Sequence, residues 1–233
     1  MSFAIVKELQ YHYNLGYTYF KMADYEFALK AFQKVVDLQK YYPRSKVRDA
    51  HMRMGDSEFA LSRFWSAMEQ YNKGIVMSPA QSDYALFQKG LSYGFVDRNN
   101  QKISTLKELI YKHPNSAYID DAYYELGSAY SVASSYATAI NTYNEMITRY
   151  PKSPYIPKAI LNKGLILYNQ EKLNRAETVL KNLVSRFPKN IFAQQALVTL
   201  KEIAVDLDEV LQFTQWLKAL KIDAFSDNSA ITQ

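Results

Sequence analysis

The sequence predicts an all-α fold, a right-handed superhelical solenoid of about twelve helices that pair as antiparallel hairpins. Three observations predict it. The 233 residues contain only seven glycines and seven prolines, too few for the many turns of an all-β sandwich. Five of each recur in one register at spacings of 35 to 39 residues, a period typical of stacked helix pairs. Between these markers, apolar residues recur at three- and four-residue steps, as on the buried face of a helix.

The marker residues locate the repeats. Successive marker prolines are 36, 35, 37 and 37 residues apart, and the glycines 39, 35, 37 and 37. Because a glycine inside a helix costs about 1 kcal/mol relative to alanine, its recurrence predicts close approach of a neighbouring helix. An alanine twelve residues after four of the glycines is expected to supply the matching gap. The markers are Gly16, Gly55, Gly90, Gly127, Gly164, Ala28, Ala67, Ala139, Ala176, Pro43, Pro79, Pro114, Pro151 and Pro188.

The repeats follow in order and predict a single solenoid over residues 1–220. In the third unit Lys102 stands where the small alanine is expected, which predicts an irregular helix–helix approach. Ser45, Ser116 and Ser153 stand where a hydroxyl can cap the next helix. We also expect the chain to be a segment of a longer protein. The predicted parts are full helix pairs at approximately 5–43, 44–79, 80–114, 115–151 and 152–188, a degenerate helix pair at 189–220, and a polar tail or linker at 221–233.

Two sets of marker residues resemble a known family. Leu15-Gly16, Tyr19, Ala28 and Phe32 resemble the tetratricopeptide repeat pattern L-G-x-x-Y…A-x-x-x-F. A second unit matches it more completely, through Leu126-Gly127, Tyr130, Ala139, Tyr143 and Pro151. The resemblance covers about 190 of the 233 residues. It implies a solenoid whose first helices line the surface that binds a protein or peptide partner.

The junctions between units carry a narrower resemblance. The segments YYPRSKVRDA, KHPNSAYIDDA and RYPKSPYIPKA share P-x-S, then a bulky residue, then alanine. They resemble the subclass found in bacterial cell-envelope tetratricopeptide proteins, such as the outer-membrane assembly lipoprotein and the Tol-associated periplasmic protein. If this resemblance holds, the protein is periplasmic or part of the cell envelope. The sequence alone leaves the localisation open.

The family resemblance also implies which residues face a partner, namely those six and three positions before each glycine and one and four after it. In the first three units aromatic residues are frequent there, and aromatic side chains are enriched at protein interfaces. The alternative, that these rings pack between adjacent helices, stays open. Tyr13 and Tyr17 replace the Lys and Asn of the family's carboxylate clamp, so an acidic chaperone tail is not expected. The candidate partner-binding residues are Tyr13, Tyr17, Phe20, Met52, Phe59, Tyr84, Phe87, Leu91, Tyr124 and Tyr168.

The net charge of +5 is unevenly distributed along the chain. Residues 146–201 carry ten basic side chains against Glu171 and Glu177. Such a block could contact nucleic acid, an anionic membrane surface or an acidic protein, but we favour a solvated lysine-rich face. A nucleic-acid partner is not expected, since its site should interleave stacking aromatics with clustered arginines.

Nothing in the sequence predicts catalysis, a cofactor or a metal site. Cysteine is absent, which excludes thiol nucleophiles and cysteine–zinc sites, and no nucleotide-binding or hydrolase motif occurs. His12 and His51 share one repeat position and are expected to pack, and Asp120-Asp121 are adjacent and point to different helix faces. No apolar run of about 18 residues could span a bilayer.

The sequence therefore predicts a non-catalytic scaffold that binds a protein or peptide of unknown identity, within a bacterial envelope assembly. The alternative function is a structural spacer or self-association module of a longer repeat protein.

Overall fold

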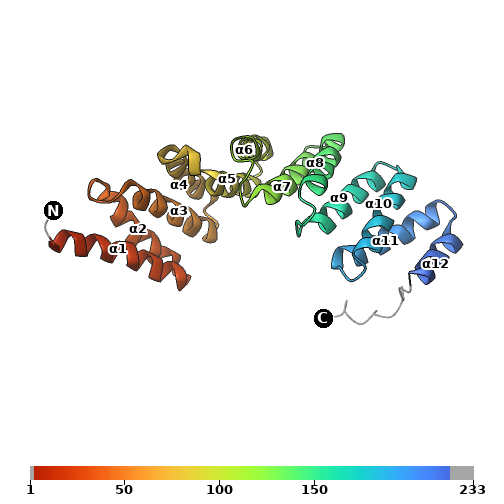
Figure 1. The fold of residues 1–233 in the computed structure, drawn as a ribbon, viewed down its shortest axis with the longest axis horizontal. Coiled ribbons are helices and arrows are strands. Elements are labelled where there is room, and N and C mark those ends of the chain that lie inside the picture. The colour runs from red at the N-terminus through yellow and green to blue at the C-terminus, as the bar shows by residue number, and fades with distance from the viewer. Residues whose placement is uncertain (1–2, 221–233) are drawn as a thin grey trace. The chain divides into compact units, whose positions relative to one another are not determined.

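A computed structural model describes residues 3–220, and the predicted polar tail at 221–233 lies outside the described residues. Over the described range the chain forms twelve α-helices and no strand, which confirms the predicted fold class. Figure 1 shows the helices following one another as hairpins. The pairs in contact are α1 (Phe3–Lys21) with α2 (Tyr25–Asp37), α3 (Arg44–Ala60) with α4 (Phe64–Met77), α5 (Asp83–Phe95) with α6 (Asn99–Lys112), α9 (Ile156–Asn169) with α10 (Leu173–Arg186), and α11 (Ile191–Asp206) with α12 (Val210–Ala219). Between the third and the fourth of these pairs, α7 (Ile119–Val132) and α8 (Tyr136–Arg149) follow one another in the chain.

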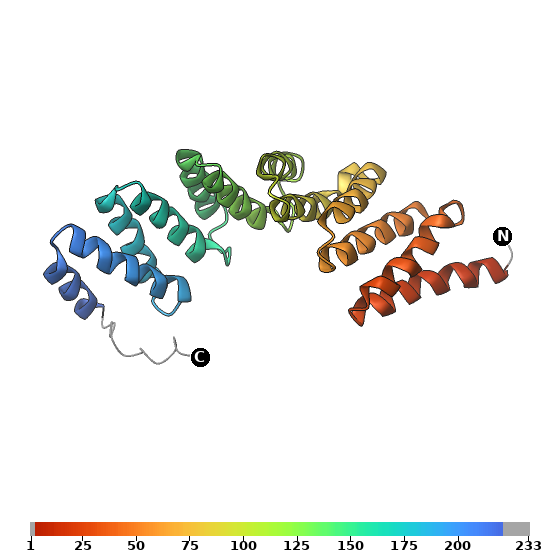
Figure 2. The ribbon, with the colours of Figure 1, turned by 180° about the vertical axis from the view of Figure 1, so that it is seen from behind.

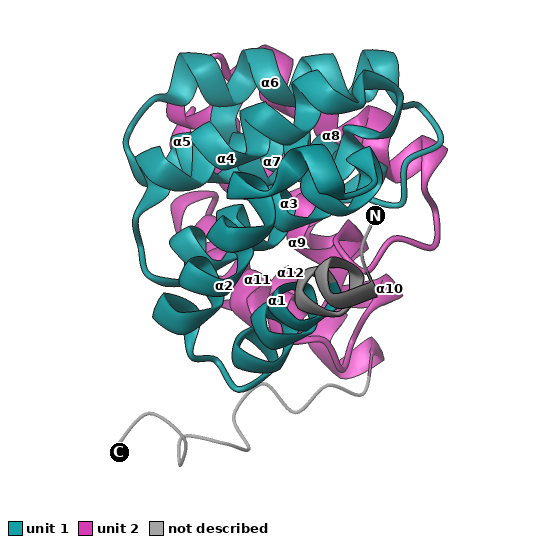
Figure 3. Cartoon of the chain, turned by 90° about the vertical axis from the view of Figure 1, so that its left-hand side faces the viewer, with its two compact units in different colours: residues 1–129 teal, residues 130–233 magenta. Residues whose placement is uncertain are grey.

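The chain divides into two compact units, coloured separately in Figure 3. Unit 1 is Met1–Ala129 and contains α1 to α6 and most of α7. Unit 2 is Tyr130–Gln233 and contains α8 to α12. The single solenoid predicted over residues 1–220 stays a prediction.

All six hairpins turn through one backbone motif, and the first of them can be followed from behind in Figure 2. The turn residue has a positive φ of 56 to 58°. The next residue donates its N–H to a carbonyl five positions back, as Asp24 does to Tyr19 at 2.9 Å and Glu209 to Ala204 at 2.7 Å. This is the Schellman termination, here without glycine at the left-handed position. The turn residues are Ala23, Ser62, Asp97, Ser134, Glu171 and Asp208.

The pair α11–α12 lacks the glycine and proline markers but keeps this turn. Asp208 follows Lys201 at the interval by which Glu171 follows Gly164. The last pair therefore shares the turn of the other hairpins, with a lysine at the position of the marker glycine.

The marker glycines leave room for a large side chain of the paired helix. A Cβ added at Gly55 would lie 2.5 Å from Cε1 of Tyr71, which is too close for any real pair of atoms. In the first hairpin, a Cβ at Gly16 would lie 2.7 Å from the Phe32 ring. The predicted close approach is thus present at four of the five marker glycines, and the facing residue comes sixteen positions after each of the four. The same pairing joins Gly90 to Leu106 and Gly164 to Leu180.

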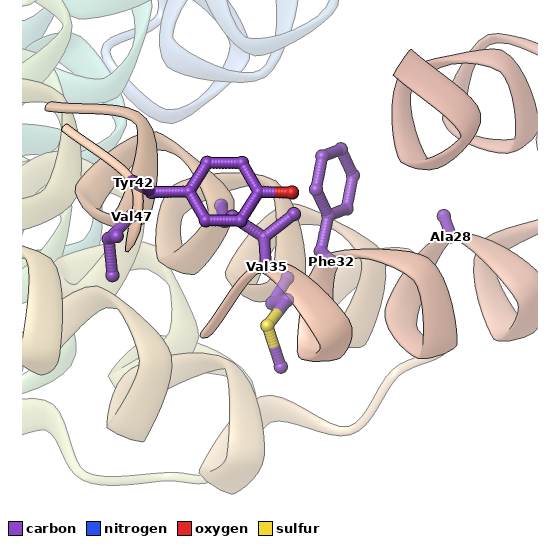
Figure 4. Close-up of a cluster of buried hydrophobic side chains, with 7 residues drawn as sticks. Ala28, Phe32, Val35, Tyr42 and Val47 are labelled. Carbon is purple, nitrogen blue, oxygen red and sulfur yellow. The ribbon is translucent and has the colours of Figure 1, made fainter. Parts of the chain in front are cut away.

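The core of unit 1 is continuous from one hairpin to the next. Figure 4 shows the Tyr42 ring, from the connection after α2, beside Val35 and near Phe32. Val47, at the start of the next hairpin, belongs to the same buried cluster, as does Ala28. Because the first three hairpins share buried clusters with their neighbours, packing fixes the positions of α1, α3 and α5 within unit 1.

The irregular helix–helix approach predicted at Lys102 is absent from the third hairpin, where Gly90 faces Leu106 by the same pairing as in three other repeats. The Lys102 side chain lies against Gly94, where an added Cβ would be 3.3 Å from the lysine Cδ. Its Nζ reaches Glu125 on α7 at 2.5 Å. A second glycine, one turn after Gly90, therefore accommodates the long side chain.

The three predicted serine caps differ in outcome. Ser116 and Ser153 accept hydrogen bonds from the N–H groups of Tyr118 and Tyr155, at 3.1 and 3.2 Å, in the turns before α7 and α9. Ser153 does not cap α9 itself, because the N-cap residue is Tyr155 and no side chain caps that helix. The prediction for Ser45 is wrong. The helix α3 starts one residue earlier, with Pro43 at its N-cap position and no side-chain cap.

Candidate functional site

A charged row on α3 lies at the centre of unit 1. Asp49, Arg53 and Asp56 are spaced by four and three residues, so they share one face of the helix. Nη1 of Arg53 lies 2.7 Å from Oδ2 of Asp56, and Nε lies 3.7 Å from Oδ1 of Asp49. The guanidinium is therefore placed between two carboxylates.

Two tyrosines of α1 bind the first carboxylate of this row. The hydroxyls of Tyr13 and Tyr17 both donate to Oδ2 of Asp49, at 2.7 and 2.5 Å. Their rings also contact each other edge-on, with centroids 5.2 Å apart. One aspartate of the second hairpin thus fixes two aromatic rings of the first.

The second carboxylate binds two tyrosines from other helices. Tyr71 of α4 and Tyr84 of α5 donate to Oδ1 of Asp56 at 2.9 and 2.6 Å. The Arg53 guanidinium lies between two rings, 5.8 Å from the Phe20 centroid and 5.6 Å from that of Tyr84, in cation–π geometry. The network therefore links α1, α3, α4 and α5.

Burial determines the electrostatics of this network. It raises the pKa of Asp56 above its usual range, although Arg53 and the two phenols act in the opposite direction. Burial, with the hydrogen bond to Asp49, raises the pKa of Tyr17. Burial and the charge of Asp56 likewise raise the pKa of Tyr84. The phenols therefore stay protonated and remain hydrogen-bond donors at neutral pH.

The ten candidate residues lie in different environments. Tyr13, Tyr17, Phe20 and Tyr84 are half-buried and meet in the network, so the structure brings these four together. Leu91 and, in unit 2, Tyr168 are half-buried away from it.

Phe59 belongs to a separate aromatic cluster. Its ring lies 5.3 Å from Phe64 and 5.5 Å from Phe95, measured between centroids. The side chain of Phe95 is 61% exposed, so this cluster reaches the surface at the ends of α3 and α5.

Three candidates are too buried to contact a partner, and their prediction needs correction. Met52, Phe87 and Tyr124 are 3%, 8% and 5% exposed. The Met52 methyl fills the space beside Gly74, and Phe87 stacks on Tyr118 with ring centroids 5.5 Å apart. Repeat position alone did not show that neighbouring helices cover these three side chains.

Sequence reasoning missed Arg53 and Tyr71 as site residues. Arg53 is two positions before Gly55, outside the four positions that the family resemblance implies. One signal was present: Tyr13 and Tyr17 stand three before and one after their glycine, while Asp49 stands six before the next. A phenol and a carboxylate at such positions of successive repeats can meet across the first helices.

Three clefts lie outside this network, and none is lined by any of the ten candidates. One of about 510 Å³ lies between α3, α4 and the connection before α3, and two of about 370 and 160 Å³ lie along α8, α9 and α10. His51 lines the first cleft; it is 7% exposed, and its Nδ1 lies 2.9 Å from Oε1 of Gln70.

Within residues 3–220, no group of three or more histidines, aspartates or glutamates is arranged to hold a metal ion. No helix in that range has the length and apolar character needed to cross a membrane.

Helix hairpins that repeat at intervals of 35 to 39 residues and share one turn define a helical repeat protein. Models of the tetratricopeptide repeat match residues 9–42, 84–116, 121–153 and 158–190, together more than half of the chain. The chain belongs to the tetratricopeptide repeat family. Domains of this family bind protein partners and are generally non-catalytic scaffolds.

Comparison with solved structures supports the same fold. A crystal structure of MamA protein is 20% identical, with a TM-score of 0.67, and the match covers 78% of this chain and 92% of that one. A tetratricopeptide repeat protein from Parabacteroides merdae is 12% identical, with a TM-score of 0.70 and coverage of 92% and 79%. Pseudomonas aeruginosa pilF is 16% identical, with a TM-score of 0.63 and coverage of 92% of both chains. No curated protein matches the sequence. At these identities the similarity is one of fold.

Proposed function

We propose that this protein is a non-catalytic scaffold that binds a peptide or protein segment on the first-helix face of unit 1. We define this face by Tyr13, Tyr17, Phe20, Asp49 and Tyr84. The observation that carries the proposal is a set of half-buried aromatic rings on α1 and α5 that the carboxylates of Asp49 and Asp56 on α3 hold in place. Rings that are already ordered lose little conformational entropy when a partner covers them.

The charges of the same face favour one kind of partner. Two carboxylates, Asp49 and Asp56, flank the single guanidinium of Arg53. A segment that presents a positive charge beside an aromatic or aliphatic side chain would complement both the charge and the rings.

The partner-binding test compares two tyrosines that differ in position. Tyr17 belongs to the face, while Tyr111 on α6 is 86% exposed and lies outside it. Partners are first captured from the source organism with the wild-type protein and identified by mass spectrometry. Affinity and thermal midpoint are then measured for Tyr17→Ala, Tyr17→Phe and Tyr111→Ala. Tyr17→Ala should weaken binding by about 2 kcal/mol, Tyr17→Phe should weaken it less, and Tyr111→Ala should leave it unchanged.

The opposite result assigns Tyr17 to packing. In that case Tyr17→Ala lowers the thermal midpoint strongly, while the folded fraction binds the partner with normal affinity. The same result for Tyr13 and Phe20 would exclude this face as the binding site.

We infer a place in a bacterial cell-envelope assembly from the P-x-S junctions, two of whose serines bind backbone N–H groups before the next helix. Fractionation of the source organism with an antibody to the protein tests this inference. Recovery in the periplasmic or membrane fractions supports it, and recovery in the cytosol alone rejects it.

Self-association is the second candidate function, and one observation favours it. Ile191, Val198 and Val205 recur every seven residues on α11 and are 57%, 62% and 60% exposed. An apolar stripe of this kind can pair with another copy of the chain. Sedimentation velocity of the wild type and of Val198→Glu tests this function. A wild type that stays monomeric as its concentration rises would reject it.

A further inference from the structure

The two clefts of unit 2 lie one after the other along α9. The larger is lined by Ile160 and Lys163 of α9, and the smaller by Leu167 of the same helix and Gln170 at its C-cap. These residues recur at three- and four-residue steps, so they lie along one face of α9. The remaining lining residues come from α8 and from α10 with Lys172 just before it. We call the two clefts together the α8–α10 furrow, with α9 as its floor.

The furrow carries positive charge along its whole length. Lys163 and Arg186 line the larger cleft, and Lys172 and Arg175 line the smaller one. Neither cleft is lined by an aspartate or a glutamate. Two acids of the flanking helices pair instead with cations outside the clefts: Glu145 with Arg149 at 3.0 Å, and Glu177 with Lys181 at 2.5 Å.

Neutral groups orient two of these cations without cancelling their charge. Nζ of Lys163 donates to Oδ1 of Asn144 at 2.8 Å, and Nζ of Lys172 donates to Oε1 of Gln170 at 2.9 Å. Burial lowers the pKa of Lys163, and the charge of Arg175 lowers it further. The furrow therefore concentrates positive potential that an incoming anion would relieve.

We propose that the α8–α10 furrow binds an extended acidic segment of a protein partner, whose carboxylates pair with Lys163, Lys172, Arg175 and Arg186. Arginine can hold a carboxylate through two parallel hydrogen bonds, which favours a defined register. Between the cations, Ile147, Ile160 and Val179 give the furrow apolar wall that suits intervening aliphatic side chains.

The dimensions and composition of the furrow agree with this occupant. A helix the length of α8 spans about 21 Å, which corresponds to about six residues of extended chain. No aromatic residue lines either cleft, so the furrow offers no platform on which nucleic-acid bases could stack. These side chains are distinct from those of the first-helix face, so the two proposals can fail separately.

The test uses the full chain and a short fluorescent peptide of alternating glutamate and valine, with a glutamine–valine peptide as control. Fluorescence anisotropy should show binding of the acidic peptide alone. Raising the salt from about 0.05 to about 0.5 M should weaken it strongly, because the charges are partly exposed. The double variant Arg175→Gln with Arg186→Gln should weaken binding about tenfold or more. The control, Lys189→Gln with Lys201→Gln, removes equal charge outside both clefts and should change affinity less than about twofold.

Three results would overturn the proposal. The first is that the acidic peptide does not bind. The second is that both double variants weaken peptide binding equally. The third is that a single-stranded oligonucleotide or an anionic lipid vesicle binds more tightly than the peptide through the same two arginines. Circular dichroism melting of each variant separates lost binding from lost folding. If the arginine variant unfolds, the single variant Lys163→Gln provides the measurement, with Lys201→Gln as its control.

Discussion

The clefts of the two units differ in the partners of their cations. In unit 1, Arg44 and Lys73 line the cleft formed by α3, α4 and the connection before α3, and Lys73 pairs with a carboxylate. Nε of Arg44 donates to the carbonyl of Met77 at 3.2 Å, and Nζ of Lys73 lies 2.9 Å from Oε1 of Glu69. In unit 2, none of the four cations of the α8–α10 furrow pairs with a carboxylate of the described residues. The clefts therefore differ in charge, because a lining cation pairs with a carboxylate in unit 1 and none does among the described residues of unit 2.

The two units also differ in charge at equivalent positions of their first helices, where unit 1 carries the acidic side chains. Asp49 and Asp56 of the second repeat correspond, six before and one after the glycine, to Lys158 and Leu165 of the fifth. At these positions unit 1 has carboxylates that accept hydrogen bonds from phenols, while unit 2 has a cation and an aliphatic side chain. The two units share one fold, but their surfaces at these positions differ in charge, so they suit partners of opposite charge.

The largest expected effect concerns the network that only unit 1 has. Asp56→Ala leaves Arg53 without its closest carboxylate and Tyr71 and Tyr84 without their acceptor. The Asp56 and Arg53 side chains are 9% and 24% exposed, so we expect a loss of about 3 kcal/mol in the free energy of unfolding of unit 1. Hydrogen exchange should show lost protection in α3 to α5 and unchanged protection in α9 to α11, because repeats contact mainly their neighbours.

The matched control is Asp49→Ala. That side chain is 29% exposed and its contact with Arg53 is longer, at 3.7 Å, so the loss should be smaller. Equal losses in both variants would contradict the larger role of the more buried Asp56. A loss of protection that extends through unit 2 would show that the two units do not respond separately.

The next effect concerns a feature that both units share, the close approach at the marker glycine. Gly55→Ala places a methyl group against the Tyr71 ring, which is fully buried and bound through its hydroxyl to Asp56. We expect a destabilisation of about 2 kcal/mol by overpacking, measured by urea unfolding. Gly94→Ala is the control, because Gly94 is exposed and faces only the flexible Lys102 side chain. It should be neutral or slightly stabilising, since alanine favours the helix by about 1 kcal/mol.

The fold was predictable because its determinants are periodic in the sequence. Gly16, Gly55, Gly90 and Gly164 mark points where a helix must accept a large side chain, and the structure shows that contact at each. Ala28, Ala67 and Ala176, twelve residues after Gly16, Gly55 and Gly164, are buried, as a close helix pair requires. Periodicity could not show that Gly94 accommodates Lys102, because that solution depends on one additional glycine outside the register.

The candidate site was predictable only in part. Repeat position placed Tyr13, Tyr17, Phe20 and Tyr84 on one face, but it could not show which side chain each hydroxyl reaches. The contact of Arg53 with two rings depends on rotamers of a long flexible chain, which no spacing rule fixes.

A smaller effect uses pH to separate the two units. Burial raises the pKa of Asp56, so folded unit 1 binds this proton more tightly than the unfolded chain does. Stability from this group therefore increases as the pH falls from about 7 toward about 4, and decreases as the pH rises. The unfolding free energy of the wild type minus that of Asp56→Asn should shift in favour of the wild type on acidification. Other carboxylates titrate in both proteins and cancel in the difference, and a shift of the opposite sign would contradict the raised pKa.

The smallest effect tests whether the two units differ in backbone as well as in charge. Ser62 turns the second hairpin and Glu171 the fifth, both with a φ of 58°. A side chain in this left-handed conformation costs about 1 kcal/mol, which glycine avoids, but glycine also has more freedom to lose on folding. Ser62→Gly and Glu171→Gly should therefore each stabilise by about 0.5 kcal/mol or less in urea unfolding. Equal effects would confine the difference between the units to side chains. A clear loss in one variant alone would mean that its native side chain stabilises that turn, so the repeats would differ in their turns too.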